Sequence, residues 1–207
     1  FTGEVPRAFE PTFSPTGSRW VYHSKVTIWK CPVTEMQRTK SHGLLYKTLK
    51  ADASFSRQGC PDYLTVFRKW TPDVPSAAPV LHTEEEFPLE LWQRFASPVW
   101  MDIDQTNVLN VEAARGDKDE KHICPLQLDV IERCVRLWSN PGDVVFSPFT
   151  GLGSEGFVAL QQGRRFVGAE LKREYFEAAK RNLRRATAQG DLFTTAPRGD
   201  RVNSAPG

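Results

Sequence analysis

Three glycines and one acid have the residue types and spacing of a ligand site. Residues 146–156 read FSPFTGLGSEG, in which Gly151, Gly153 and Gly156 form the pattern G-x-G-x-x-G directly after the apolar run DVVF. A glycine between a strand and a helix permits positive φ angles and omits the Cβ that would block a ligand. Glu170 closes the next apolar run, 19 residues beyond Gly151, where a carboxylate accepts hydrogen bonds from ribose hydroxyls. Loop and acid together predict a site for a cofactor that contains adenosine.

Two cofactors fit this pattern, and a tight turn without any ligand would use the same glycines. A dinucleotide would place its pyrophosphate at the helix N-terminus. S-adenosylmethionine has the ribose and the adenine but no phosphate. The glycine pattern alone does not choose between them, so an NAD-dependent oxidoreductase stands as an alternative.

The elements that must position this site alternate between helix and strand. An amphipathic helix is expected over 125–140, with Pro125 at its first position. DVVFS then reads as a short buried strand, and the glycine loop leads into a second helix. RRFVGAEL reads as another strand, and a long helix follows that ends at Gly190. This order predicts an α/β fold with a parallel sheet covered by helices.

The N-terminal half has a different pattern. Aromatic and β-branched runs predict strands over 20–30 and 62–70, with a short helix at about 43–50 between them. Residues 71–90 read as an irregular connector, and the structure of the segment after Leu91 is ambiguous. The expected organisation begins with a loop or linker over 1–18 and ends with a disordered tail over 191–207. Between them we expect one domain in three parts: a strand pair with a basic loop (19–70), a connector or recognition insert (71–119), and a cofactor-binding half (120–190).

Charge is distributed unevenly along a chain whose net charge is only +2. Residues 19–70 carry ten Lys or Arg against three Asp or Glu, whereas residues 71–140 carry six against thirteen. A basic half is the footprint of a nucleic-acid face, and a solvated surface is the alternative. No stretch approaches 18 apolar residues, so no membrane span is expected. The four cysteines form no C-x-x-C pair, which predicts no metal site and a reduced, cytoplasmic protein.

Three contiguous blocks between Glu120 and Leu183 carry more specific patterns. They read EKHICPLQLDVIERCVRLWSNPGDVV, SPFTGLGS and GRRFVGAELKREYFEAAKRNL. They resemble the patterns HPTQKPLxLxERxI, DPFxGxGS and GRxFxGxExxxxYxxxAxxRL of the amino-group DNA methyltransferases, in the permuted beta class. The resemblance implies a Rossmann-like, S-adenosylmethionine-dependent methyltransferase fold, permuted and incomplete in this chain. It implies methyl transfer to adenine N6 or cytosine N4 of double-stranded DNA.

The resemblance extends upstream and covers roughly residues 20–185. VTIWKCPVTEMQRTKSHGLLYKTLKADASFSRQGCPDYLTVFRKW and LWQRFASPVWMDIDQTNVLNVEAARGDKDEKHICPLQ are similar to the phage-type branch of this family. In that branch a methylase domain sometimes follows a helicase, so a helicase upstream in the same polypeptide is a possible partner. The implied location is the cytoplasm of a bacterial or phage-infected cell.

The resemblance also implies roles for individual residues. The loop would contact the methionine part of S-adenosylmethionine through Ser147, Phe149, Gly151, Gly153 and Ser154. Glu170 would hold the ribose and Leu171 would flank the adenine. The preceding block would cover the methionine end with His122, Cys124, Pro125 and Leu126. The family usually has Asp where this chain has Ser147, and a hydroxyl cannot pair the charge of the cofactor's ammonium, so a lower affinity is expected.

The basic segment would face DNA phosphates. The residues implied are Lys25, Lys30, Arg38, Lys40, Lys47, Lys50 and Arg57. Arg38 and Arg57 have a structural role as an alternative.

The catalytic motif of such enzymes, D/N/S-P-P-Y/F/W, does not occur in the 207 residues. SPVW, residues 97–100, is the nearest imitation, but it lacks the second proline. The permuted class places the motif earlier, so we expect it ahead of Phe1 and expect the isolated chain to be inactive and poorly folded. The catalytic residues are therefore unknown, and a non-catalytic DNA-binding relic is a second alternative.

Overall fold

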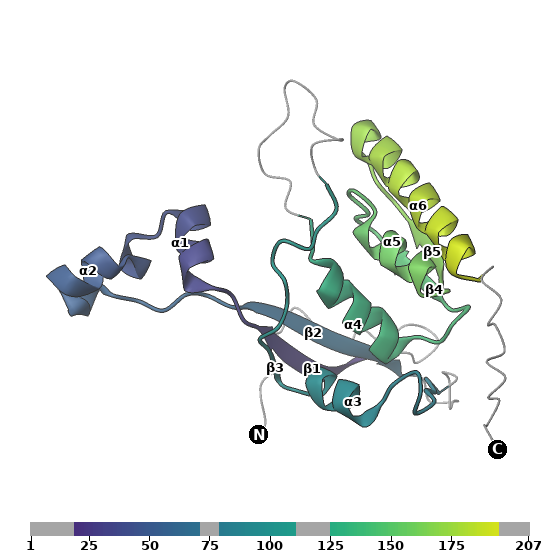
Figure 1. The fold of residues 1–207 in the computed structure, drawn as a ribbon, viewed down its shortest axis with the longest axis horizontal. Helices are drawn as coiled ribbons and strands as arrows, with labels where there is room; N and C mark the ends of the chain where they lie inside the picture. Colours follow the sequence, from purple (N-terminus) through teal and green to yellow (C-terminus); the bar gives the residue numbers. More distant parts are fainter. Residues whose placement is uncertain (1–18, 71–78, 111–124, 195–207) are drawn as a thin grey trace, which may run out of the picture. The chain divides into compact units, whose positions relative to one another are not determined.

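The computed structural model describes residues 19–70, 79–110 and 125–194. The chain folds as two compact units, residues 1–105 and 106–207, and their boundary falls inside the segment expected as a connector. Figure 1 shows the elements of both units. Each unit is described by itself.

The first unit contains a three-stranded sheet in the order β2-β1-β3. Strands β1 (Arg19–Ile28) and β2 (Asp62–Trp70) are antiparallel, with a register shift between Tyr22 and Ser24. The two residues of β3 (Val99–Trp100) pair with the end of β1 in parallel. Both long strands were predicted from their aromatic and β-branched residues. However, β1 ends at Ile28 rather than at residue 30.

Between β1 and β2 the chain leaves the sheet as a helical projection, which we call the arm and define as residues 29–61. It contains α1 (Pro32–Thr39), the 3₁₀ turn η2 (His42–Leu44), α2 (Tyr46–Ala51) and the 3₁₀ turn η3 (Ala53–Phe55). In Figure 1 the arm extends away from the strands that carry it. The single helix predicted at 43–50 is therefore wrong in its bounds, since Leu45 is extended and divides η2 from α2. The helix α1 was not predicted.

After β2, the described chain resumes without helix or strand until α3 (Leu89–Phe95), which resolves the ambiguous segment. Pro88 is extended and precedes the helix, as expected for a residue that lacks a backbone N–H. The buried apolar residues of this unit come from β1, α3, β3 and the turn that follows: Val26, Ile28, Phe95, Trp100 and Ile103.

The second unit is the alternating helix-and-strand region. Helices α4 (Leu128–Trp138), α5 (Ser154–Gln161) and α6 (Arg173–Thr194) accompany the parallel strands β4 (Val144–Ser147) and β5 (Arg165–Gly168). Figure 1 shows α5 beside α6, and α5 also packs against α4. The buried core gathers from these helices, the glycine loop and the segment before α4: Leu109, Ile131, Val135, Leu152, Phe157, Val158, Ala178 and Ala186. The predicted order of elements is confirmed.

Three details of that prediction are wrong. Pro125 precedes the helix, because α4 begins at Leu128 with Gln127 as its N-cap. Strand β4 is not buried, since Val144 and Phe146 are exposed and only Ser147 is buried. Helix α6 continues past Gly190 to Thr194, so the segment expected to be disordered starts as helix. A glycine inside a helix costs only about 1 kcal/mol, which is not enough to stop a long one.

Candidate functional site

The glycine loop lies at one edge of the β4–β5 pair. The two strands are parallel and pair Ser147 with Gly168, so their carboxyl ends lie side by side. The Ala169 N–H donates to the Ser147 carbonyl (3.0 Å), and the Thr150 N–H donates to the Ala169 carbonyl (2.9 Å). These bonds continue the ladder beyond the strands and hold the loop over the strand ends, where α/β proteins bind their ligands.

The three glycines have three different roles. Gly151 has φ +52° and a Cβ there would meet no atom within 4 Å, so this backbone is open to a ligand. Gly153 has φ +84° and caps α5, and a Cβ there would lie 3.2 Å from the Ala179 Cβ. A Cβ on Gly156 would lie 2.5 Å from both the Leu183 Cδ2 and the Phe166 Cδ1. Gly153 and Gly156 therefore serve helix packing, and Gly151 is the glycine that faces open space.

Glu170 is joined directly to the loop. Its Oε2 accepts a hydrogen bond from the Gly151 N–H (2.7 Å), and its Oε1 accepts one from the Lys172 N–H (2.9 Å). A carboxylate has about four acceptor positions, so each oxygen keeps capacity for a ligand hydroxyl. The two features that suggested a site in the sequence are thus a single hydrogen-bonded unit at the strand edge.

The remaining loop residues divide into exposed and buried ones. Phe149 is 86% exposed, which excludes a core role for this ring, and Leu171 next to Glu170 is fully exposed. Ser147 and Ser154 are buried, at 6% and 4% exposure. Two large apolar side chains, one in the loop and one next to Glu170 in sequence, are therefore exposed, which suits a ligand with an apolar surface.

A hollow of about 150 Å³ lies beside Glu170, lined by loop, strand and α6 residues. It includes Thr150, Gly168, Phe176 and Leu183. This volume is below the range of about 300–1,000 Å³ usual for ligand cavities. In the described part of the second unit, the site is therefore an open edge with a shallow recess.

Of the four residues expected to cover the methionine end, His122 and Cys124 lie outside the described residues. Pro125 is half-buried and Leu126 is exposed. They lead into α4, whose first turn is held by Asn107: its carbonyl accepts from the Leu128 N–H (2.8 Å), and its Nδ2 donates to Asp129 (2.6 Å).

Two residues that sequence reasoning missed support the loop. Thr150 is buried, and its hydroxyl donates to the Ser147 carbonyl (3.3 Å). Asn182 of α6 donates from Nδ2 to the Leu152 carbonyl (2.9 Å). A signal for Asn182 exists in the sequence, since it interrupts the apolar stripe of Ala178 and Ala186 at helical spacing.

Burial raises the pKa of two titratable groups in this unit. Burial raises the pKa of Glu155, in the first turn of α5, above its ordinary value. Burial also raises the pKa of the Cys134 thiol to about 12, so this cysteine is an inert core residue. Among the described residues, His, Cys, Asp and Glu side chains form no group of three that could hold a metal ion.

Six of the seven cations expected to face DNA lie on the arm, and Lys25 lies on β1 with its Nζ 3.7 Å from the centre of the Tyr63 ring. Lys30 pairs with Asp62 (2.7 Å), and Arg57 donates from Nε to the Ser41 hydroxyl (2.9 Å). The Arg57 contacts agree with the structural alternative for that residue. The other four are exposed: Arg38, Lys40, Lys47 and Lys50.

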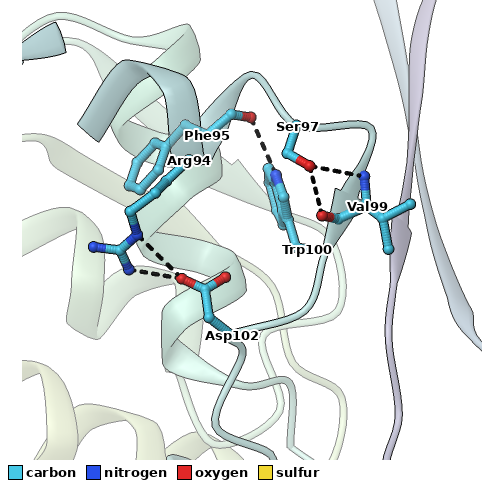
Figure 2. Close-up of polar contacts among 6 residues, drawn as sticks. All are labelled: Arg94, Phe95, Ser97, Val99, Trp100 and Asp102. Carbon is cyan, nitrogen blue, oxygen red and sulfur yellow. Dashed lines mark hydrogen bonds and ion pairs between the residues drawn. The ribbon is translucent and has the colours of Figure 1, made fainter. Parts of the chain in front are cut away.

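The side chains of Ser97 and Trp100 in SPVW, residues 97–100, make hydrogen bonds to neighbouring backbone. Figure 2 shows the Ser97 hydroxyl donating to the Val99 carbonyl (2.8 Å) and accepting from the Val99 N–H (3.3 Å). Trp100 is 1% exposed and its indole N–H donates to the Phe95 carbonyl (3.1 Å). A buried tryptophan cannot stack on a flipped base. SPVW therefore does not have the arrangement of a catalytic motif.

Within the described ranges, no helix combines the length and apolar composition that a membrane crossing requires.

Comparison with known proteins gives relatives of one kind. A 58-residue segment is 43% identical to the type II methyltransferase M1.MboII of Moraxella bovis, covering 28% of this chain and 22% of that protein. A 67-residue segment is 37% identical to the DNA adenine methyltransferase YhdJ of Escherichia coli, covering 32% and 23%. The chain thus matches less than a quarter of the length of either relative.

A solved structure matches over a longer stretch. TTHA0409 of Thermus thermophilus, named as a DNA modification methylase, superimposes with a TM-score of 0.54 at 23% identity, over 81% of this chain and 57% of that one. This likeness establishes the α/β, Rossmann-like fold. The sequence model of the DNA methylase family that covers N6 and N4 enzymes matches residues 5–181. The chain therefore belongs to the DNA methylase family.

Proposed function

We propose that this chain carries the cofactor site and a DNA-facing arm of an enzyme that transfers a methyl group from S-adenosylmethionine to adenine N6 or cytosine N4 of DNA. The observation that carries the cofactor site is the 2.7 Å bond from the Gly151 N–H to Glu170. It joins an open loop and an acid at one strand edge, which supports a ribose site there. Family membership and the names of the relatives support the reaction.

The site residues fit this cofactor. The free acceptor positions of Glu170 would receive the ribose hydroxyls. The exposed Leu171 would cover one face of the adenine, and Phe149 would pack against the methionine part. The open backbone at Gly151 would approach the ligand without a side chain between them. When bound, S-adenosylmethionine supplies a sulfonium-activated methyl group, which requires no nucleophile from the protein.

The arm supports the choice of DNA as the substrate. Residues 29–61 hold six Lys or Arg against two acids, a net charge of +4. Such a surface attracts the phosphate backbone without reading its sequence. From the phage-type resemblance we also propose a helicase domain in the same polypeptide, and from the bacterial relatives a cytoplasmic location.

Calorimetric titration with S-adenosylmethionine, and with NAD in parallel, tests this proposal. Glu170→Gln keeps the side-chain volume but removes the charge, so we expect at least a roughly tenfold loss of affinity for S-adenosylmethionine, as charge-assisted hydrogen bonds are the stronger kind. Glu174→Gln is the matched control, because Glu174 is an exposed acid in the first turn of α6. It should leave the affinity unchanged.

The outcomes separate the alternatives. Binding of NAD without S-adenosylmethionine would replace the methyltransferase by an oxidoreductase. Binding of neither by a folded chain would favour a DNA-binding relic. Equal affinities of the two acid variants would remove Glu170 from the site.

A further inference from the structure

A second and larger hollow lies in the first unit and contains no residue of the glycine loop. It has a volume of about 570 Å³, and the arm forms most of its wall. Its apolar lining includes Trp29, Leu45, Tyr46 and Leu49. Arg57 also lines it and brings positive charge, whereas Lys30 lines it but is paired with Asp62 (2.7 Å). An apolar recess with aromatic rings and cations is suited to a flat ring that carries a negative charge nearby.

Hydrogen bonds join the two sides of the arm, so the hollow is formed without a ligand. The Arg57 N–H donates to the Gly43 carbonyl (3.1 Å), and the Arg57 side chain donates to Ser41. Both carboxylate oxygens of Glu35 accept from the Cys60 N–H, at 3.1 and 3.0 Å. A preformed site loses less conformational entropy when it binds.

The arm is cationic on balance, with six Lys or Arg against two acids. Local hydrogen bonds hold both acids: Glu35 accepts from the Cys60 amide, and Asp52 accepts from the backbone and the hydroxyl of Ser54 (2.8 and 2.6 Å). Lys47 and Lys50 stand exposed on α2, the helix that also carries Tyr46. Tyr46 is 74% exposed, so its ring is open to a ligand. Two cations and an exposed aromatic ring thus occur on one short helix.

We propose that this hollow binds an unstacked base of DNA, with Tyr46 as the stacking ring and the α2 lysines on the flanking phosphates. Proteins of this chemical kind hold extruded or single-stranded bases on aromatic side chains beside cationic groups. A paired duplex hides the flat faces of its bases, so the hollow discriminates unstacked from stacked DNA. This inference rests on the proposed function, because it takes DNA as the substrate.

Fluorescence anisotropy of the full chain with three labelled DNAs of one sequence tests the proposal. They are a fully paired duplex, the same duplex with one bulged adenine, and the bulged duplex with an abasic site at that position. Stacking of one base on an aromatic ring corresponds to a preference of roughly 5- to 100-fold. We expect the bulged adenine to bind tighter than the other two DNAs by a factor in this range.

Variants of two exposed aromatic residues locate the effect. Tyr46→Ala should abolish the preference for the bulge, and Tyr46→Phe should keep it. Phe55→Ala is the matched control, because Phe55 is 72% exposed on the same arm but does not line the hollow. Circular dichroism checks that the variants fold, as expected for side chains so exposed.

Equal binding of all three DNAs would overturn this inference and leave the proposed function standing. So would a preference that Phe55→Ala removes as completely as Tyr46→Ala. If the chain binds no DNA under any condition, the DNA part of the proposed function fails as well, whereas the S-adenosylmethionine titration still tests the cofactor site independently.

Discussion

Individual atoms in the glycine loop decide what the cofactor site can hold. The Gly151 N–H is already bound to Glu170 at 2.7 Å, so the methionine end of the cofactor must find other partners. Ser147, at the base of the loop, is where the family usually has an acid. Its hydroxyl is buried at 6% exposure and carries no charge. If the cofactor's ammonium binds there, as we propose, the missing charge lowers the affinity that the loop can reach.

Ser147→Asp should raise the affinity for S-adenosylmethionine. A carboxylate pairs the cofactor's ammonium, and the gain of a charged over a neutral hydrogen bond is about 1 kcal/mol, or about fivefold in affinity. The free protein should lose stability, because the new charge is buried without a partner. Calorimetry gives the affinity and thermal unfolding gives the stability. An unchanged affinity, with a folded variant, would show that the ammonium does not bind at Ser147.

Short elements carry the charges that we propose face DNA, and they pack the unit that holds the glycine loop. On the arm, Lys30 is paired with Asp62 and has a side chain only 27% exposed, whereas Lys47 is exposed on α2. In the second unit, α5 approaches β5 and α6 so closely that Gly156 has no room for a Cβ. Each arrangement can be tested by substitution.

Lys47→Ala should weaken binding of paired DNA of any sequence and reduce the slope of log affinity against log salt by about one. Lys30→Ala should change that slope less, since its charge is already neutralised by Asp62 at 2.7 Å. Anisotropy titrations at several salt concentrations measure both slopes. Equal reductions would mean that Lys30 leaves Asp62 when DNA binds.

Gly156→Ala should destabilise the second unit. The new Cβ would lie 2.5 Å from the Leu183 Cδ2 and the Phe166 Cδ1. Overpacking typically costs about 1–3 kcal/mol, and the higher helix propensity of Ala returns about 1 kcal/mol of this. A net loss of up to about 2 kcal/mol in denaturant unfolding is expected. In a Leu183→Ala background the same substitution should cost less; an identical cost in both backgrounds would exclude crowding by Leu183 as the cause.

The elements that the sequence predicted well are those with a strong local pattern. Strand β2 has the predicted bounds, because aromatic and β-branched residues make up most of the segment from Tyr63 to Trp70. The helix after Gly153 was predicted because a glycine between a strand and a helix permits positive φ, and Gly153 has φ +84°. The helices of the arm were not predicted correctly. Helix α1 buries none of its residues, so its sequence has no apolar stripe that would indicate a helix. The exposure of Phe146 was missed because a short apolar run is normally buried.

Candidate site residues were likewise predicted only where a local sequence pattern indicates them. Glu170 was found because acid and glycines stand at a fixed spacing along the chain. Asn182 and Thr150 were missed because each stabilises the loop from a position that only the folded chain brings near. The arm's hollow was missed for that reason too: Trp29, Tyr46 and Arg57 are far apart in sequence, and turns that no simple period describes bring them together.

At the scale of the whole molecule, the two proposed ligands belong to different units. The glycine-loop site lies wholly in residues 106–207, and the arm lies wholly in residues 1–105. Each unit has its own buried apolar residues. A ligand that binds only the native form stabilises the unit that holds it.

Hydrogen exchange should therefore separate the two binding events. S-adenosylmethionine at about 100 times its dissociation constant should add about 2.7 kcal/mol of protection to amides of β4, α5 and β5. Amides of β1 and β2 should change little. DNA should protect the arm instead. Protection of both units by S-adenosylmethionine alone would show that they open as one cooperative body.

The exposed strand β4 has a consequence for handling the protein. Val144 and Phe146 present apolar side chains to water, as does Val167 on β5, and in the described chain these two strands pair only with each other. Open edges beside apolar side chains favour self-association as protein concentration rises. At high synthesis rates a large share of the expressed protein should therefore aggregate in inclusion bodies. The yield of dissolved protein should rise at lower temperature and lower protein concentration, because hydrophobic association weakens in the cold.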